Sequence, residues 1–323
     1  MNEVWSLDLA EVARRWQWCM TAWAPLPGGT GRLIRVTWRL PDHTQAETVY
    51  KRIGIAEAHW YGALWPRWPH FGVEPLWVWD RGDESAVLLP DMGPSLYESL
   101  SRLSPEKRTP VLLEAALWLA DLHVAGQGIG EQWFAAGELS GYRRESALIW
   151  AKRALAVLRN AADGGCTAVQ SEIERLAAMA DRVYDHMEEW EVGPTTLIHG
   201  DPHLANMVRG QGGGLFLIDW EYPSVSVPAR DFTVLLQDVW DPGLAEAMVG
   251  IWRGRLRDTG WKADGEEFWR TYQAVRFDNT LMMLGHDFAR RSDATGIACT
   301  PELHECFAVK MGWLKEAFTY LVH

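Results

Sequence analysis

The residues best suited to chemistry in this 323-residue sequence lie in two short stretches. The first, LIHGDPHLANMV, contains Asp201 and, five positions later, Asn206; the second, LIDWE, contains Asp219. An amide oxygen and a carboxylate are ligands of the kind that Mg²⁺ prefers, so we expect Asn206 and Asp219 to hold that ion. Asp201 is placed to orient an acceptor hydroxyl and to accept its proton. The set predicts phosphoryl transfer from a nucleotide, in which the protein mainly positions an anionic group and neutralises its charge through Mg²⁺.

The order and spacing of these residues make coincidence improbable. Each residue type accounts for a few per cent of protein sequence, so His-Gly-Asp with Asn five places after Asp arises by chance in about one chain of this length in a thousand. From Asn206 to Asp219 the sequence NMVRGQGGGLFLID has two apolar runs joined by a Gly-rich turn, which predicts a β-hairpin. The residues predicted to carry the chemistry flank this hairpin.

The elements that must position these residues change in character along the chain. The first 90 residues alternate short β-branched runs with turn residues, which predicts a small sheet with one internal helix. From Asp91 onward, apolar residues recur at helical spacing over long segments, so the rest is predicted to be mainly helical. The predicted elements are a helix at 7–20, a strand–turn–strand unit around LPGGTGRLIRVTWRL, a strand at 46–53, a helix at 57–65, strands at 76–79 and 85–90, and helices at 111–123 and 173–187.

HGD followed by four residues and Asn, and then an apolar-apolar-Asp-Trp segment, resembles the aminoglycoside phosphotransferase and choline kinase family. The resemblance implies an α+β, protein-kinase-like two-lobed fold over nearly the whole chain. Residues 1–90 would form the nucleotide-binding N-lobe, a small antiparallel β-sheet with one helix. Residues 91–323 would form a mainly helical C-lobe with the catalytic loop, the metal site and the acceptor pocket.

The same resemblance implies an activity, the transfer of the γ-phosphate of ATP or GTP to a hydroxyl of a small molecule such as an aminoglycoside, an amino alcohol or a sugar. The alternative is a catalytically inactive nucleotide-binding protein with this fold, although none of the expected residues is missing. A protein Ser/Thr kinase is disfavoured because the loop reads HGD rather than HRD and the metal segment reads DWE rather than DFG.

Two charged residues of the N-terminal part match the nucleotide-binding residues of the family. Lys51 resembles the strand lysine that contacts the α and β phosphates, and Glu57 resembles its helix partner, with Glu47 as the fallback. Without the resemblance, Lys51 would be interpreted as a solvated strand lysine, and Glu57 as a carboxylate favoured by the helix dipole.

The remaining nucleotide contacts are predicted only from position in the implied fold. The loop LPGGTGR, with Gly29 and Thr30, would lay backbone N–H groups along the phosphates, although a plain hairpin turn explains it equally well. The segment VLLPDMGPSL resembles the connection between lobes, and its backbone near Leu89 and Met92 would contact the adenine edge. Pro90 removes one backbone donor there.

Other polar residues near the motif are predicted to support it. His199 could act as a general base, but it is interpreted as a structural brace of the loop, since a buried hydrogen-bonded His is the commoner situation. His203 could approach the phosphates or the metal, but it is interpreted as a residue that packs the loop. Asp231 resembles the family's Asp that anchors the catalytic loop, with simple N-capping as the alternative. The candidates for contact with a cationic acceptor, each otherwise a solvated helix carboxylate, are Asp238, Asp241, Asp278 and Asp287.

Composition bounds the partners and the compartment. The formal charge of −12 disfavours nucleic acid as a partner, and an acidic surface favours a cationic acceptor or simply solubility. With no apolar run of membrane length and no secretory leader, we expect a cytoplasmic monomer or homodimer that does not bind membranes. The cysteines are scattered and form no CxxC pair, which argues against a disulfide framework or a zinc site: Cys19, Cys166, Cys299 and Cys306.

Overall fold

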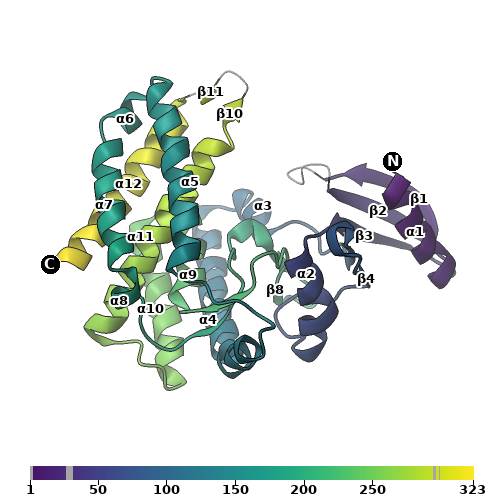
Figure 1. Cartoon of the computed structure of the whole chain (residues 1–323). Coiled ribbons are helices and arrows are strands. Elements are labelled where there is room, and N and C mark those ends of the chain that lie inside the picture. Colours follow the sequence, from purple (N-terminus) through teal and green to yellow (C-terminus); the bar gives the residue numbers. More distant parts are fainter. Residues whose placement is uncertain (1–2, 27–31, 294–295, 298) are drawn as a thin grey trace. The chain divides into compact units, whose positions relative to one another are not determined.

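The computed structural model describes residues 3–26, 32–293, 296–297 and 299–323 (Figure 1). The chain divides into two compact units. Unit 1 consists of Met1–Glu98 and Asn206–Tyr222, and unit 2 consists of Ser99–Ala205 and Pro223–His323. The order of the helices and strands confirms a mixed α+β protein with a sheet in its N-terminal part and a mainly helical C-terminal part.

An antiparallel sheet is the centre of unit 1. Its buried face follows the period of two expected for a strand, with Ile34, Val36 and Trp38 fully buried on β2. Leu9 and Val12 of helix α1 pack into the same hydrophobic cluster. In the described part of unit 1 the sheet has five strands in the order β1-β2-β3-β5-β4: β1 Cys19–Pro25, β2 Leu33–Arg39, β3 Gln45–Arg52, β5 Ala86–Pro90 and β4 Trp77–Trp79.

Helix α1, Glu3–Trp16, ends earlier than the sequence predicted. Gln17 adopts the left-handed conformation with φ 57°, and the N–H of Trp18 donates to the carbonyl of Ala13 at 3.1 Å. This arrangement closes the helix and lets β1 begin at Cys19. The prediction of a helix over 7–20 was wrong at its C-terminal end, because Trp18 contributes its apolar side chain to the sheet core from outside the helix.

The helix predicted at 57–65 is confirmed. Helix α2, Ile55–His59, continues as a π-helical turn, η1 Trp60–Leu64, and a 3₁₀ turn, η2 Trp65–Arg67. Trp60, Trp68 and Trp79 are at most 4% exposed, so these tryptophans pack the interior. A further 3₁₀ turn, η3 Gly82–Glu84, joins β4 to β5.

The predicted hairpin between Asn206 and Asp219 is present and belongs to unit 1. Strand β7, Met207–Arg209, pairs antiparallel with β8, Leu215–Leu217, after the 3₁₀ turn η4, Leu204–Asn206. The N–H of Leu217 donates to the carbonyl of Phe71 at 2.8 Å. An antiparallel bridge between Ser95 and Val208 holds the other strand of the hairpin, β7. Backbone hydrogen bonds therefore join the hairpin to segments more than 100 residues earlier in the chain.

Unit 2 is mainly helical, as predicted. A large apolar core joins the four helices Arg144–Asp163, Ile173–Asp185, Gly265–Ala289 and Pro301–Val322. Among the described residues, no helix combines the length and apolar character that crossing a membrane would require. The elements not yet named are α3 Leu96–Ser101, which starts in unit 1, α4 Pro105–Ala135, α5 Arg144–Asp163, α6 Thr167–Gln170, α7 Ile173–Asp185, α8 Met187–Trp190, β6 Thr196–Ile198, β9 Ser224–Ser226, α9 Ala229–Leu235, η5 Leu236–Asp238, α10 Pro242–Asp258, α11 Gly265–Ala289, β10 Ser292–Asp293, β11 Gly296–Ile297 and α12 Pro301–Val322.

Strand β6 leads into the HGD loop, and helix α4 lies directly on it. Gly130 of α4 makes this possible, because a Cβ at that position would come within 2.6 Å of the backbone nitrogen of Leu197. The hydroxyl of Thr196 donates to the carbonyl of His123, also on α4, at 2.6 Å. The start of the HGD loop is therefore fixed by a strand that the longest helix of unit 2 covers.

The cysteines differ from expectation. Cys166 and Cys299 form a disulfide across 133 positions of sequence, with Cα atoms 5.5 Å apart. The scattered spacing argued against a disulfide framework, and for Cys166 and Cys299 that expectation was wrong, because spacing along the chain carries no information about residues that the fold brings together. Cys19 and Cys306, in the described part of the chain, are free thiols.

Candidate active site

A partly buried lysine lies between two carboxylates in unit 1. The ammonium of Lys51 is 2.7 and 2.6 Å from the two carboxylate oxygens of Glu57 and 2.5 Å from Oδ1 of Asp219. Glu57 is 1% exposed, so its charge is balanced by this pairing. The pairing of Lys51 with Glu57 agrees with the sequence, whereas the fallback partner, Glu47, is exposed on β3.

Local structure explains how these three side chains meet. Lys51 is near the end of β3, paired with Val87 of β5, and the chain turns after it into helix α2. Glu57 lies in the first turn of that helix, six positions after Lys51. Asp219 directly follows the β7–β8 hairpin and adopts φ 65°, a backbone conformation in which few residues other than Gly are found. A sparsely populated conformation of this kind is typical of functional sites.

Burial and charge set the protonation of this group. Burial lowers the pKa of Lys51, but Glu57 and Asp219 more than offset this effect and hold its pKa above the ordinary value. Lys51 is therefore a permanent cation at neutral pH. Burial raises the pKa of Glu57 to about 7 against the opposing effect of Lys51, and the charge of Asp219 adds to the rise.

The hairpin brings the two predicted metal ligands to the same end. Met207 pairs with Leu217, so Asn206 and Ile218 are the next opposing positions, and the N–H of Ile218 donates to the carbonyl of Asn206 at 3.0 Å. Asp219 follows immediately. Its side chain is 39% exposed, whereas Asn206 is 7% exposed. The amide of Asn206 and the carboxylate of Asp219 thus project from adjacent backbone positions at one end of the β7–β8 hairpin.

The sequence did not identify the aromatic contact behind this site. The indoles of Trp60 and Trp220 stack with centroids 3.8 Å apart and planes 9° apart. Both rings are fully buried. Trp220 was noticed only as part of the Asp-Trp motif, and no periodicity would have paired it with a residue 160 positions earlier.

The HGD loop lies in unit 2 and is held by Asp231, at the start of α9. The carboxylate of Asp231 accepts the backbone N–H groups of His199 at 2.7 Å and Gly200 at 2.8 Å. Oδ2 of Asp231 also lies 3.4 Å from Nε2 of His123. Gly200 has φ 90°, which a side chain would strain. The anchoring predicted for Asp231 is confirmed, and its carboxylate is committed to the loop.

Asp201 follows this anchored turn. Its N–H donates to Nδ1 of the fully buried His199 at 3.2 Å, so that ring braces the loop as predicted. The Asp201 carboxylate is 32% exposed, and one of its oxygens lies 3.5 Å from Nε2 of His203. Nδ1 of His203 accepts the N–H of Ala205 at 3.2 Å. A carboxylate near solvent thus projects from a backbone fixed on both sides.

A second carboxylate holds the far end of the loop. Oδ2 of Asp238 accepts the N–H of Leu204 at 2.8 Å. Burial raises the pKa of Asp238, although the hydrogen bond from Leu204 and the charges of His203 and Lys310 oppose the rise. Asp238 was predicted as an acceptor candidate, and the structure gives it a contact within the loop that sequence position alone did not indicate.

The other acceptor candidates are engaged in contacts within unit 2. Asp241 caps α10 by accepting the N–H groups of residues 243 and 244. Asp278 is 1% exposed and pairs with Arg230 at 2.6 Å, so the interpretation of this residue as a solvated helix carboxylate was wrong. Asp287 pairs with the buried Lys310 at 2.6 Å and remains 30% exposed.

The residues predicted at the nucleotide base and phosphates are placed in part. Leu89 lies on β5, 6% exposed, and pairs with Val49. Met92 follows that strand and is partly buried. Gly29 and Thr30 lie outside the described residues. Lys51, Glu57, Asn206 and Asp219 all belong to unit 1, and Asp201 belongs to unit 2.

Comparison with known proteins gives a family and a fold. Residues 56–266 match the model of a family described as the phosphotransferase enzyme family. No curated protein matches. The choline kinase LicA from Streptococcus pneumoniae is similar over 99% of both chains, with a TM-score of 0.57 and 12% identity.

Two further solved structures share this fold. An aminoglycoside phosphotransferase from Alicyclobacillus acidocaldarius is similar over 94% of this chain and 91% of its own, with a TM-score of 0.55 and 14% identity. The spectinomycin phosphotransferase APH(9)-Ia, solved with ADP and spectinomycin, is similar over 97% and 98% of the two chains, with a TM-score of 0.54 and 14% identity. The predicted fold is thereby confirmed.

Proposed function

Because the chain belongs to the phosphotransferase enzyme family, we propose that it moves the γ-phosphate of ATP or GTP to a hydroxyl of a small molecule. The observation that carries the proposal is the position of the Lys51 ammonium, within 2.7 Å of both Glu57 and Asp219. A partly buried cation held between a helix carboxylate and the carboxylate that follows a hairpin is an arrangement that can position nucleotide phosphates.

Asn206 and Asp219 fit an Mg²⁺ ion. Both offer oxygen atoms, the donors that Mg²⁺ takes, and the hydrogen bond between Ile218 and Asn206 keeps their backbones at one end of the hairpin. When bound there, Mg²⁺ would neutralise charge on the nucleotide phosphates. Lys51 then has the task of orienting the phosphates, and Glu57 fixes the direction of its ammonium.

Asp201 is the proposed catalytic base. Its backbone is held by His199 and its loop by Asp231 and Asp238, so the point from which its carboxylate projects is fixed. In this role, one carboxylate oxygen of Asp201 accepts the proton of the acceptor hydroxyl while the hydroxyl oxygen attacks the γ-phosphorus. The bond between the γ-phosphorus and its bridging oxygen breaks, and ADP or GDP leaves.

Two observations support a small acceptor that carries amines. The similar structures are described as acting on choline, aminoglycosides and spectinomycin. The formal charge of −12 favours the approach of a cation. One of the similar structures holds ADP and another AMP, which supports a nucleotide donor.

The proposal is tested by an ADP-release screen of aminoglycosides, amino alcohols and sugars with MgATP and MgGTP, followed by the variant Asp201→Asn. We expect turnover to fall by about 100-fold to 10,000-fold while Mg-nucleotide binding by calorimetry is retained. The matched control is Asp181→Asn, which makes the same substitution at an exposed position on α7 and should leave turnover unchanged.

Near-normal turnover of Asp201→Asn would remove Asp201 from its role. Nucleotide binding by the wild-type protein without either acceptor phosphorylation or slow nucleotide hydrolysis would instead support the inactive nucleotide-binding alternative.

A further inference from the structure

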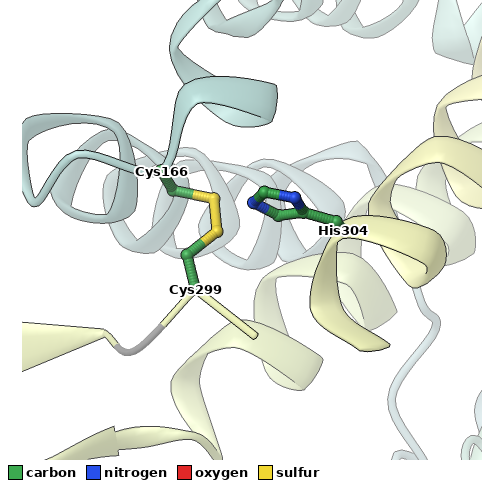
Figure 2. A group of neighbouring side chains, drawn as sticks. All are labelled: Cys166, Cys299 and His304. Carbon is green, nitrogen blue, oxygen red and sulfur yellow. A yellow bond between two sulfur atoms is a disulfide. The ribbon is translucent and has the colours of Figure 1, made fainter. Parts of the chain in front are cut away.

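Three ligand-forming side chains meet in unit 2 and have no part in the proposed phosphoryl transfer. The sulfur atoms of Cys166 and Cys299 and a ring nitrogen of His304 all lie within 4.8 Å of one another. Figure 2 shows the disulfide with the imidazole of His304 beside it. The three residues come from the start of α6, the segment after β11 and the first turns of α12.

Helix ends fix the positions of these residues. Cys166 is 1% exposed, its N–H donates to the carbonyl of Ala161 at 3.0 Å, and its own carbonyl accepts the N–H of Gln170 at 2.9 Å. The N–H of His304 donates to the carbonyl of Thr300 at 3.0 Å, at the capped start of α12. Cys166 belongs to the main apolar core of unit 2, and Cys299 packs against it.

Two sulfurs and one imidazole nitrogen are the ligand types that Zn²⁺ takes. With Zn–S bonds of about 2.3 Å and Zn–N bonds of about 2.0 Å, neighbouring ligand atoms of a tetrahedral site are roughly 3.3–3.8 Å apart. The three ligand atoms lie at most 4.8 Å apart, which exceeds the spacing in a zinc site by no more than roughly 1.5 Å. Side-chain rotation can make up this difference once the sulfurs are no longer bonded to each other. His304 is exposed, so a water molecule can reach the fourth position.

We propose that Cys166, Cys299 and His304 bind one Zn²⁺ ion when the disulfide is reduced, with water as the fourth ligand. The disulfide is then the metal-free form of the same site. Two molecules of a thiol such as glutathione supply the two electrons that break the S–S bond and leave as one disulfide, so that Cys166 and Cys299 become thiols. Zn²⁺ binding displaces the two thiol protons to solvent.

The reducing condition matters because disulfides rarely persist where glutathione keeps thiols reduced, and a cysteine cluster in such a compartment more often binds metal. The site does not depend on the phosphotransferase activity. Its nearest alternative is a permanent structural disulfide, in which His304 has no role.

The test uses the full chain, reduced with a phosphine, freed of metal by a chelator and titrated with Co²⁺ as a spectroscopic substitute for Zn²⁺. We expect one equivalent to bind with the thiolate charge-transfer and tetrahedral bands of a site with two sulfur ligands. Zn²⁺ should then displace it. Protein oxidised with glutathione disulfide should show neither band.

Matched variants separate the three ligands from the other thiols. Loss of a hydrogen-bond partner of a ligand weakens metal binding by about 10-fold to 100-fold, so loss of a ligand in Cys299→Ser or His304→Ala should weaken it by about 100-fold or more. Cys19→Ser, an exposed thiol outside the cluster, should bind as the wild-type protein does. Because His304 is exposed, we expect His304→Ala to fold, so it tests the site even if a cysteine variant fails to fold.

Two results would overturn the proposal. One is reduced wild-type protein that gives no thiolate band with Co²⁺. The other is His304→Ala that binds Co²⁺ with unchanged affinity and spectrum.

Discussion

Trp60 and Trp220 stack almost face to face, with ring centroids 3.8 Å apart, and both are fully buried. Trp60 comes three residues after Glu57, and Trp220 comes directly after Asp219. Each of the two carboxylates that pair with Lys51 therefore lies close in sequence to one tryptophan of the stacked pair. Packing between the rings fixes the distance between helix α2 and the end of the hairpin, on which the lysine contacts depend.

The stack makes Trp220 a stability determinant of unit 1. Trp220→Ala should lower the free energy of unfolding by about 3–5 kcal/mol, because it removes a buried indole and leaves a cavity. Trp220→Phe should cost less and raise the KM for the nucleotide through a displaced Asp219. Urea denaturation and nucleotide-dependent kinetics measure the two effects. Trp240→Phe, at a 45% exposed position in unit 2, is the control, and equal losses in both proteins would contradict the role of the stack.

Lys51 and Glu57 should be strongly coupled. Lys51→Met leaves a carboxylate that is 1% exposed without its main partner and should cost about 3–5 kcal/mol of stability. Lys51→Met combined with Glu57→Gln should recover part of that loss, since both charges are then absent. A double-mutant cycle by urea denaturation gives the coupling. Additive effects of the two changes would show that the contact has no energetic importance.

The raised pKa of Glu57 predicts a pH dependence of stability. Its pKa is ordinary in the unfolded chain and about 7 in the folded protein, so between these values the folded state binds more protons. Raising the pH through this range therefore destabilises the fold, by up to roughly 3 kcal/mol from this group. The stabilisation is complete below about pH 4.5 and lost above pH 7.

Glu57→Gln isolates this effect. The unfolding free energy of the wild-type protein minus that of Glu57→Gln should fall steadily from pH 5 to pH 7.5 when measured without nucleotide. A difference that stays constant over this range would show that Glu57 titrates normally.

Asp231 should control the geometry of the HGD loop. Asp231→Ala leaves the N–H groups of His199 and Gly200 without their acceptor, and each unsatisfied group costs about 1–3 kcal/mol. We expect lower stability, and a fall in kcat that exceeds any change in nucleotide affinity, because the loop carries Asp201. Thr300→Ala, which removes the side-chain cap of α12 at a cost of about 1 kcal/mol, is the control, with kcat retained. A wild-type kcat in Asp231→Ala would contradict the anchoring role.

Sequence patterns were informative where local structure determines the outcome. The β7–β8 hairpin follows from two apolar runs and a Gly-rich turn. The Lys51–Glu57 contact joins residues only six positions apart, but it was predicted through the family resemblance and not from a local pattern. The end of α1 was missed because Gln17, which has no strong preference for the left-handed conformation, takes it there.

Features that join distant segments were not predictable from one sequence. The Trp60–Trp220 stack, the Arg230–Asp278 ion pair and the Cys166–Cys299 disulfide all depend on how helices and strands pack after they form. The sequence around Asp278 looks like that of a helix carboxylate exposed to solvent. Only the folded structure shows that Asp278 is buried and paired with Arg230. Recognition of the loop as a motif did not require such information, because its residues are close in the chain.

Because residues 206–222 belong to unit 1, genetic recombination cannot exchange either unit through a single crossover. The chain changes unit at three places, after Glu98, Ala205 and Tyr222. A single genetic crossover after Glu98 would deliver Lys51 and Glu57 to a recipient without the Asp219 and Trp220 that pack with them. Exchange of a complete unit between homologous genes needs all three junctions at once, so we expect the two units to be inherited together.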